Sequence, residues 1–576
     1  MNSIGFNNFR RFASFPEMDL GDITLLVGGN NSGKSTLVKA LLLCLDNARL
    51  MTAGSRDNVF SAMSPKFRFD ANELNDVKVK TFARAIHNRP APSLDLLDDK
   101  LTLPSKMRFT FTLGNFKFVI EVSGDRDKDE VTGNVSYISI EDRGNMLQYA
   151  VNYDFHSMTY SVLGSTSERE TLVKRLYNEY VSAKQSLDKL SEDGADIAAI
   201  SAQSEKVASL EKRIEEFVNP EGNELPENFD YEEALKSQFV QTLENFTATS
   251  YGPLHLKDYG MTVNENLLVH IIGNFMDYSR VTGEPQPTGI KDPDEYALAM
   301  QAWMYEEDAR EAMKQDLDKM RKSKEALEFL LDNLCVEYIT AHAANQNTIY
   351  NTADRNDYIA QTVHEFVRAK IARGQEEYIF VTDWMKQFGI GDDFEVLAID
   401  GEAYRVRIKD EGGYIVNLAD KGMGSIQMMI LLLRLATILR NYRPEQRYIL
   451  YKEDIPAPTV IIEEPEQNLH PRMQSWLADL FHYLNKKYHC KFIIETHSEY
   501  LIRKTQVLVS EENYKDEQDI NDNNPFKVYY FPMDGTDRYE MHYTISGRFS
   551  NKFGEDFFDE AGKSNLITLR KEKGLK

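Results

Sequence analysis

Short apolar runs, each bounded by glycine or polar residues, are the clearest pattern in the chain. Residues 23–27, 459–464 and 491–495 each centre on an apolar stretch of the length of a buried strand. Residues 37–45 and 472–488 carry the periodicity of helices that pack on a sheet. Strands and helices that alternate in this way predict an α/β fold.

A second pattern, strict alternation of apolar and polar residues, occurs between residues 107 and 140. It covers Met107–Leu113, Phe116–Val122 and Val135–Ile140, and glycine-containing turns separate the three runs. A period of two is typical of strands with one buried face. The pattern therefore predicts an antiparallel meander.

Helical periodicity dominates residues 168–217. Apolar positions recur at alternating steps of four and three from Leu176 to Leu190, and they resume after Gly194 from Val207 to Phe217. This predicts two helices folded back into a short antiparallel coiled-coil hairpin. A plain helical pair packed on the body of the protein fits the same pattern nearly as well.

The later part of the chain predicts two loops and one strongly apolar helix. Residues 409–413 predict a hairpin turn, and residues 418–440 read as a glycine loop followed by the helix. Residues 510–524 are acidic and rich in asparagine, so we expect a mobile loop there.

Composition and charge narrow the class of protein. A hydrophobic fraction of 42% and a charged fraction of 27% are ordinary for a soluble globular protein. The net charge of −24 argues against a surface that binds nucleic acid over its whole extent, but it is compatible with a local basic patch. The three cysteines are far apart and form neither a disulfide framework nor a zinc site. With no signal peptide and no apolar run of about 18 residues, we expect a cytoplasmic protein without a membrane contact.

The strongest chemical motif follows the apolar run at residues 23–27. Residues 28–36 read Gly-Gly-Asn-Asn-Ser-Gly-Lys-Ser-Thr, which is a P-loop between a strand and a helix. Its backbone N–H groups can surround phosphate oxygens, Lys34 can reach the β- and γ-phosphates, and Ser35 can ligate Mg²⁺. The expected cofactors are ATP and Mg²⁺, and the expected binding residues of the loop are Gly28, Asn30, Asn31, Ser32, Gly33, Lys34, Ser35 and Thr36.

Two carboxylates at the end of the run at residues 459–464 complete the nucleotide chemistry. Glu463 can hold Mg²⁺ through water, and Glu464 can orient and deprotonate the attacking water. His497 follows the apolar run at residues 491–495 and could bond the γ-phosphate, although a lone histidine there is more often structural. Near the N-terminus, Arg10 and Arg11 read as solvated edge charges more than as ligand contacts.

A second glycine loop, residues 420–427, also leads into a helix whose N-terminus could bind an anion. Its candidate binding residues are Gly422, Gly424, Ser425 and Gln427. Because this loop is so far along the chain from the P-loop, we expect a site shared by two subunits, each closing the nucleotide site of the other.

The set of motifs resembles the ABC-type ATPase heads shared by SMC, RecF, RecN and OLD-family proteins. Walker A corresponds to Gly28–Ser35, the signature to the loop at residues 420–427, and Walker B to Val460–Glu463. The resemblance makes Glu464 the catalytic glutamate and His497 the switch histidine. The sequences Ile-Glu-Glu-Pro-Glu and Glu-Thr-His-Ser are most similar to those of the OLD-like branch, whose members often belong to bacterial antiphage systems.

This resemblance implies an ABC-type P-loop ATPase head with a mixed sheet, an antiparallel β subdomain and an inserted helical or short coiled-coil region. We expect an N-terminal ATPase lobe at 1–165 and a helical insertion at 166–345. A C-terminal ATPase lobe would follow at 346–509, and a C-terminal extension at 510–576.

The chain also departs from its relatives. No glutamine precedes Gln148, so the Q-loop residue is unidentified, with His87 and Asn88 as stand-ins. The TOPRIM nuclease domain of OLD proteins has no counterpart after His497, so we predict no intrinsic nuclease. Local basic clusters that could contact DNA are Arg84, His87 and Arg89, and the tail Arg570, Lys571, Lys573 and Lys576.

The leading interpretation is a Mg²⁺-dependent ATPase that forms a homodimer or higher homo-oligomer through its heads. It would work with a separate effector, a nuclease or a toxin, in antiphage defence, as in Septu-like systems. The alternatives are a DNA-repair ATPase of RecF or SMC type, and a slow-turnover scaffold that cages an effector. The sequence names neither the trigger nor the effector, and it leaves DNA or RNA binding and oligomer size open.

Overall fold

The computed structural model describes most of the chain. The described residues are 1–51, 65–70, 79–87, 105–153, 157–162, 180, 183–184, 186–187, 197–218, 231, 250–251, 266–269, 271–273, 317–340, 347–351, 353–354, 357–410, 412–442, 456–512, 514–533 and 537–554. Three sheets organise these residues, and the central one combines a strand from the N-terminal part of the chain with strands from its C-terminal half.

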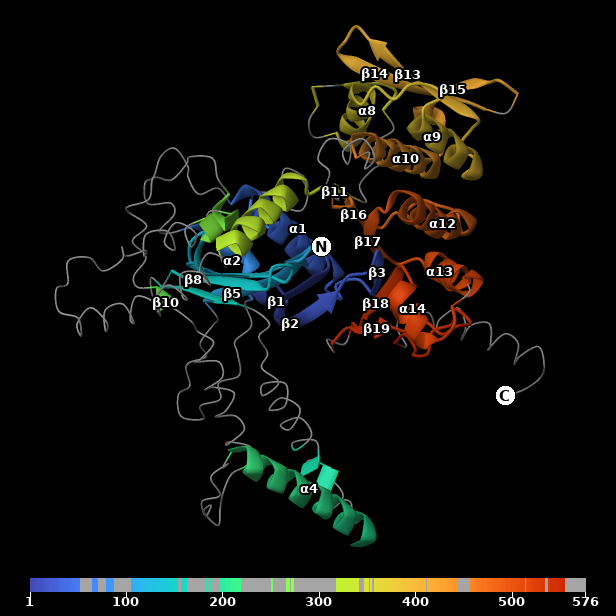
Figure 1. Cartoon of the computed structure of the whole chain (residues 1–576). Helices are drawn as coiled ribbons and strands as arrows, with labels where there is room; N and C mark the ends of the chain where they lie inside the picture. Colours follow the sequence, from blue (N-terminus) through green and yellow to red (C-terminus); the bar gives the residue numbers. More distant parts are fainter. Residues whose placement is uncertain are drawn as a thin grey trace, which may run out of the picture.

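The central sheet contains the P-loop strand. Its described strands run in the order β11-β16-β17-β3-β18-β19, and only β19 is antiparallel to its neighbour. β3 therefore lies between two strands from the far end of the chain (Figure 1). The strands are β3 (Ile23–Gly28), β11 (Val336–Ile339), β16 (Thr459–Glu463), β17 (Lys491–Thr496), β18 (Phe526–Phe531) and β19 (Tyr539–Met541).

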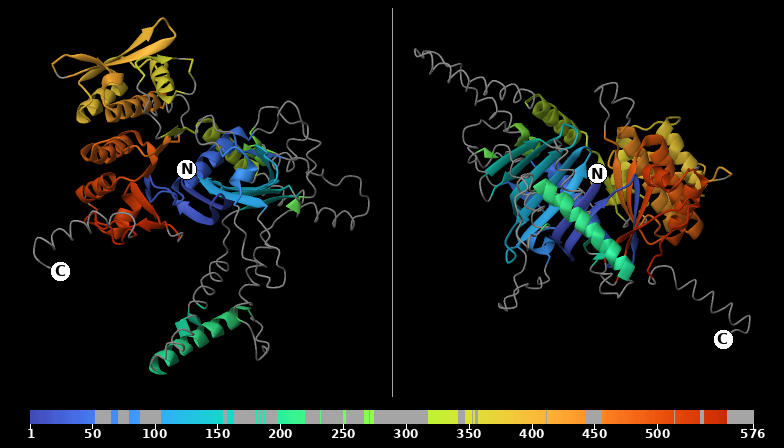
Figure 2. Two further views of the ribbon diagram at one scale, coloured as in Figure 1. Left: turned by 180° about the vertical axis from the view of Figure 1, so that it is seen from behind. Right: turned by 60° about the horizontal axis from the view of Figure 1, so that its bottom comes forward.

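The sheet separates two apolar cores. Leu26, Ile461 and Ile493 pack on the face that carries α1 (Lys34–Leu50), whereas their sequence neighbours pack on the opposite face. Successive strand side chains point to opposite faces, so the inner strands β3, β16, β17 and β18 are buried on both sides. The opposite face carries α12 (Pro471–Tyr488) and α13 (Glu499–Glu511), and Figures 1 and 2 show these helices across the sheet from α1.

A larger antiparallel sheet forms the N-terminal lobe. Its described strands run in the order β10-β9-β8-β7-β6-β5-β1-β2, with β4 paired to β7, so the predicted meander is confirmed. The elements of this lobe are β1 (Ser3–Phe9), β2 (Phe12–Asp19), β4 (Lys66–Arg68), α2 (Phe82–Ala85), β5 (Lys106–Leu113), β6 (Phe116–Ser123), β7 (Thr132–Asp142), β8 (Leu147–Asn152), β9 (Ser157–Val162) and β10 (Ser250–Tyr251).

A small sheet and three helices form a third unit. The strands are β12 (Tyr350–Asn351), β13 (Asp393–Ile399), β14 (Ala403–Lys409) and β15 (Ile415–Asn417), and the turn predicted at residues 409–413 joins the last two. The helices are α8 (Tyr358–Arg368), α9 (Glu376–Gln387) and α10 (Met423–Asn441), with a 3-10 turn at Leu418–Asp420 before α10.

Helix α10 is long and apolar enough to cross a membrane, but 78% of its apolar window is buried inside the protein. Of the helices in the described ranges it is the one that meets this criterion. Its buried side chains belong to the same core as α12 and α13. A core helix of a soluble fold has this composition because it is covered on nearly all sides.

The described part of the predicted helical hairpin agrees with two antiparallel arms. The second arm is α4 (Ile197–Val218), and Gln203 of this helix donates a hydrogen bond to the Ala183 carbonyl at 3.0 Å. Tyr180 of the first arm donates to Glu211 at 3.1 Å. Figure 1 shows α4 apart from the three sheets, so the alternative of a pair packed on the body does not fit. Leu176 and Leu190 lie outside the described residues.

Three sequence-based boundaries differ from the structure. Residues 514–523 are not a loop throughout, because α14 (Glu517–Asn523) begins after Asp516, whose side chain accepts from the Asp519 N–H. The expected insertion at 166–345 includes β11, which pairs with β16 in the central sheet. The expected extension at 510–576 includes β18 and β19, which are part of that same sheet. Parallel pairing across hundreds of residues leaves no local sequence signal, which explains both errors.

Candidate nucleotide-binding site

The P-loop adopts a conformation that two of its glycines make possible. Gly28 ends β3 with φ of 148° and Gly33 precedes α1 with φ of 115°, values that L-residues rarely adopt. A Cβ at Gly28 would lie 2.3 Å from the Phe531 carbonyl oxygen, and one at Gly33 would lie 2.4 Å from the Phe12 ring. The predicted strand, glycine loop and helix are therefore confirmed, and strand β18 packs directly against the loop.

Lys34 is buried at the centre of the loop. Its Nζ donates to the carbonyl oxygens of Gly28 at 2.9 Å and Gly29 at 2.8 Å, and only 2% of the side chain is exposed. Burial lowers the pKa of Lys34, and the neighbouring carboxylates of Glu495 and Glu464 oppose that shift. The ammonium group is thus held in the phosphate loop by two hydrogen bonds to main-chain carbonyls, which bonds to an anion could replace.

Ser35 pairs with a carboxylate that the sequence analysis did not single out. Its hydroxyl donates to Oε1 of Glu495 at 3.0 Å. Glu495 is the penultimate residue of β17 and is buried, and its Oε2 has no hydrogen-bond partner within the described residues. Burial raises the pKa of Glu495 to about 7, while Lys34 opposes the shift and Glu463 adds to it.

Glu464 and His497 lie together above the loop. The Glu464 N–H donates to the Glu495 carbonyl at 2.7 Å, and Nε2 of His497 is 3.6 Å from a Glu464 carboxylate oxygen. The His497 N–H donates to Glu466 at 2.6 Å. Burial lowers the pKa of His497, and the nearby Lys34 contributes in the same direction. A neutral imidazole beside a carboxylate is suited to donate or accept a proton.

Glu463 ends strand β16 in register with Glu495 of β17. Paired residues of neighbouring parallel strands point to the same face, and Ile461 and Ile493 two positions earlier pack on the α1 face. Glu463 is therefore directed toward the α1 face of the sheet, although it does not belong to the lining of the P-loop cavity within the described chain. Its effect on the pKa of Glu495 is a sign of its closeness to that carboxylate.

The oxygens around Ser35 suit a divalent cation. Ligand atoms of Glu464, Glu495 and His497 lie within 4.8 Å of one another. Carboxylate and hydroxyl oxygens are the ligands that Mg²⁺ prefers, and a buried carboxylate oxygen without a partner is costly unless a cation or donor meets it. The residues present therefore fit Mg²⁺ bound beside Ser35.

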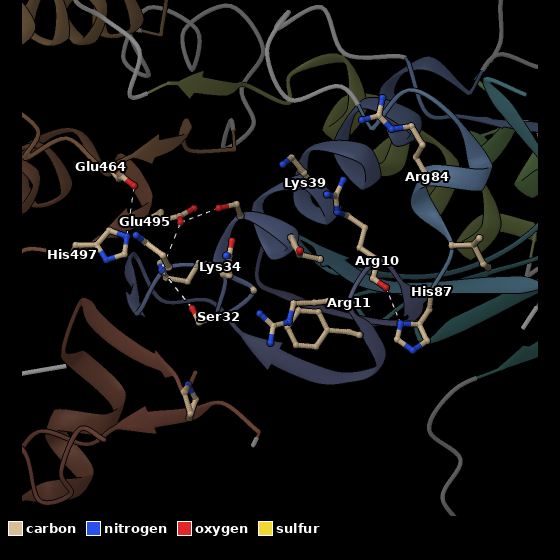
Figure 3. A pocket seen from close by; sticks show the side chains of 18 of the residues that line it. Arg10, Arg11, Ser32, Lys34, Lys39, Arg84, His87, Glu464, Glu495 and His497 are labelled. Atoms are coloured by element: carbon tan, nitrogen blue, oxygen red, sulfur yellow. Dashed lines mark hydrogen bonds and ion pairs between the residues drawn. The ribbon is translucent and has the colours of Figure 1, made fainter. Parts of the chain in front are cut away.

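A cavity of about 1270 Å³ extends from this cluster toward the N-terminal lobe. Figure 3 shows Glu464, Glu495 and His497 at one end. Basic and imidazole side chains line the rest: Arg10, Arg11, Lys39, Arg84 and His87. The cavity also contacts the remaining expected loop residues from Asn30 to Thr36. This distribution of charge favours a polyanion with a phosphate end near Lys34.

The basic wall bears on two expectations. Arg10 and Arg11 both line the cavity, but Arg11 is exposed, as expected of an edge charge, whereas Arg10 is partly buried, and burial and the neighbouring Arg84 lower the pKa of Arg10. The proposed DNA contacts Arg84 and His87 line it as well. Nδ1 of His87 is 2.7 Å from the Arg10 carbonyl oxygen, which holds the ring at the wall. Asn88, Arg89 and the basic residues of the tail lie outside the described residues.

The signature loop packs against the segment that follows Glu464. Gly422 caps α10, and an added Cβ there would meet open space, whereas a Cβ at Gly424 would lie 2.6 Å from the Asn468 carbonyl oxygen. Asn468 also donates to Gln427 at 3.3 Å. None of the four signature residues, Ser425 included, lines the P-loop cavity in the described part of this chain.

The sequence matches the family described as AAA ATPase domain over residues 1–502. No curated protein matches the chain.

Three similar solved structures are Smc heads. One is the Smc head domain with an extended coiled coil bound to the C-terminal domain of ScpA from Pyrococcus furiosus, with 11% identity, 99% of each chain covered and a TM-score of 0.31. Another is the Smc head domain with a coiled coil and joint from Pyrococcus yayanosii, with 11% identity, 95% of this chain and 97% of that chain covered and a TM-score of 0.29. The third is the SmcHead bound to the C-winged helix domain of ScpA, with 10% identity, 94% of this chain and 97% of that chain covered and a TM-score of 0.30.

The family match spans far more than half of the chain and includes the P-loop, the carboxylates at residues 463–464 and His497. The mixed α/β architecture around that loop is a P-loop ATPase fold, as the sequence predicted. The chain belongs to the AAA ATPase domain family.

Proposed function

We propose that the chain binds ATP and hydrolyses it in a Mg²⁺-dependent reaction. The observation that carries the proposal is the meeting of Lys34, Ser35 and a buried glutamate at the P-loop, beside Glu464 and His497. Lys34 would exchange its bonds to two loop carbonyls for bonds to the β- and γ-phosphates. The basic wall would receive the rest of the nucleotide.

The chemistry follows from the position of Glu464. Its carboxylate would accept a proton from a water molecule that attacks the γ-phosphorus, and the bond from that phosphorus to the β–γ bridging oxygen would break. ADP and phosphate are then released. His497 would bond the γ-phosphate and keep Glu464 oriented through their contact. Mg²⁺, held by Ser35 and Glu463, would neutralise charge on the phosphates.

We further propose that two subunits complete each site. None of the signature residues lines the P-loop cavity within the described part of its own chain, and the first-turn N–H groups of α10 lie beside an uncrowded Gly422. In a two-fold dimer or a larger homo-oligomer, Ser425 and these N–H groups would contact the γ-phosphate held by the partner. Binding of ATP would then join the two heads.

The test is complementation between two inactive variants, Lys34→Ala and Ser425→Arg. Mixed in equal amounts, they should recover about a quarter of wild-type phosphate release, because half of the dimers are mixed and each keeps one of two sites. Ser510→Arg, at an exposed serine in α13, is the matched control and should stay active. The shared site would be contradicted if the mixture released no phosphate and if wild type formed no ATP-dependent dimer in light scattering.

We also propose that this cytoplasmic ATPase acts through a separate nuclease or toxin in antiphage defence. The proposal is supported by the sequences of the Walker B and switch-histidine motifs, which resemble those of OLD-like proteins. The hairpin that includes α4 stands clear of the ATPase sheets and offers a place for a protein to dock. When the purified chain is incubated with plasmid, Mg²⁺ or Mn²⁺ and ATP, the DNA should stay intact. Toxicity to the host cell should come from neighbouring genes when they are co-expressed with the chain.

A further inference from the structure

We infer that Glu495 is a ligand-holding residue of the nucleotide-bound divalent cation, acting with Ser35 at the end of strand β17. The inference rests on the proposed ATPase function and adds a residue to it. Among the carboxylates, the sequence assigned this role to Glu463. In the structure, the Ser35 hydroxyl donates a hydrogen bond to Glu495.

The contacts of Glu495 are those of an incomplete coordination site. Oε1 accepts the Ser35 hydroxyl proton at 3.0 Å, and Oε2 is buried without a hydrogen-bond partner within the described residues. The strand on which it lies is buried on both faces, and its main-chain oxygen is fixed by the Glu464 N–H. A rigid carboxylate beside a P-loop serine is therefore prepared before a cation arrives.

The local charge also favours a divalent cation. Glu463 is in register with Glu495 on the neighbouring strand, and the ligand atoms of Glu464 and His497 lie within 4.8 Å of those of Glu495. Lys34 is the one cationic side chain recorded in an ion pair with Glu495 in the described chain, at 3.8 Å. Carboxylates gathered in a buried site repel one another unless a cation lies between them.

A purely structural ion pair between Glu495 and Lys34 is the competing explanation. The 3.8 Å separation is longer than the 2.8 and 2.9 Å bonds from Lys34 to two loop carbonyls, so these carbonyls are the closer partners of the ammonium group. The Glu495 oxygen nearest to Lys34 is Oε1, which lies closer to the Ser35 hydroxyl, at 3.0 Å. An ion-pair role would also affect nucleotide binding whether or not a metal is present, whereas a metal role would not.

The experiment uses the full chain and Mn²⁺ as the probe. Free Mn²⁺ is measured by electron paramagnetic resonance during titration, with and without ATPγS, for wild type and Glu495→Gln. ATPγS binding in EDTA is measured in parallel by calorimetry. The matched control is Glu377→Gln, because Glu377 is also buried and lies 3.9 Å from its cation, Arg440, outside the cavity.

Glu495→Gln should weaken Mn²⁺ binding in the presence of ATPγS by about ten- to a hundred-fold while ATPγS affinity in EDTA is kept. Glu495→Asp should recover part of the Mn²⁺ affinity, and Glu377→Gln should match wild type. Unchanged Mn²⁺ affinity in Glu495→Gln, or an equal loss with and without metal, would overturn the inference. Should wild type bind no ATPγS, the ATPase proposal fails instead, and titration with Mn²⁺ alone still decides whether Glu495 holds the metal.

Discussion

Replacing Glu464 by glutamine separates binding from chemistry at this site. Glutamine has nearly the same size as glutamate, and the variant should keep the main-chain conformation of Glu464, which has a positive φ of 44°. The substitution removes the carboxylate that would accept the proton of the attacking water. The P-loop, Lys34 and Ser35 are untouched, so ATP should still bind.

The expected loss in rate is far larger than any loss in stability. Removal of a general base costs about a hundred- to ten-thousand-fold in rate, which is about 2.7–5.4 kcal/mol of barrier. The contact of Glu464 with His497 spans 3.6 Å between side chains that are each 31% exposed. Half-exposed pairs of this kind contribute at most about 1 kcal/mol to the free energy of unfolding. Unfolding alone therefore cannot produce the expected loss of turnover.

The assay compares phosphate release, ATP affinity and oligomeric state for wild type and Glu464→Gln. We expect release to fall by about a hundred-fold or more, affinity to be retained, and a closed dimer to accumulate with ATP. Glu141→Gln removes a carboxylate of similar exposure, paired with Arg143 far from the cavity, and should change none of the three. Phosphate release at the wild-type rate in Glu464→Gln would refute the assignment of the general base.

Further predictions concern binding, pH and the C-terminal strands. Lys34→Ala should abolish ATP binding in calorimetry, because the buried ammonium group has no substitute in the loop; retained micromolar affinity would contradict this. Burial and Lys486 lower the pKa of His482 below 6.5, so the free energy of unfolding should fall as the pH drops through 6.5. Urea unfolding at pH 5.5 and 7.5 measures this fall, which should be smaller in His482→Phe than in wild type. Tyr543→Phe loses a buried 2.7 Å hydrogen bond to Thr505 and should cost about 1 kcal/mol in the same measurement.

The sequence predicts those parts of the fold whose causes are local. The strand, loop and helix around Gly28 follow from an apolar run next to glycines, and the meander follows from strict alternation. The pairing of β18 with β3 could not be predicted, because Phe526–Phe531 looks like any short strand and its partner lies near the other end of the chain. Helix α14 was missed because acidic and asparagine residues favour loops, yet Asp516 caps a helix there.

The candidate site was predictable where a motif names the residue. Lys34, Ser35 and Glu464 lie together as expected from their motifs. Glu495 carried one signal, a carboxylate at the end of an otherwise apolar strand, but only the contact with Ser35 shows its partner. The residues of the basic wall were named only as separate candidate contacts, because an arginine near a strand end is usually solvated and its place in a cavity depends on the lobe that packs beside it.

The position of β3 between β17 and β18 has a consequence for biosynthesis. The Tyr529 hydroxyl bonds the carbonyl of Asp19, 510 positions earlier, at 2.7 Å. At about 5–20 residues per second, a ribosome needs roughly 25–100 s to make the chain between these two residues. For most of that period the apolar strand before the P-loop has neither of its neighbours, because β17 is made only shortly before β18, so its edges are open to wrong partners. We expect the nascent chain to depend on chaperones until the last strands emerge, and the nucleotide pocket to form only after translation of β18.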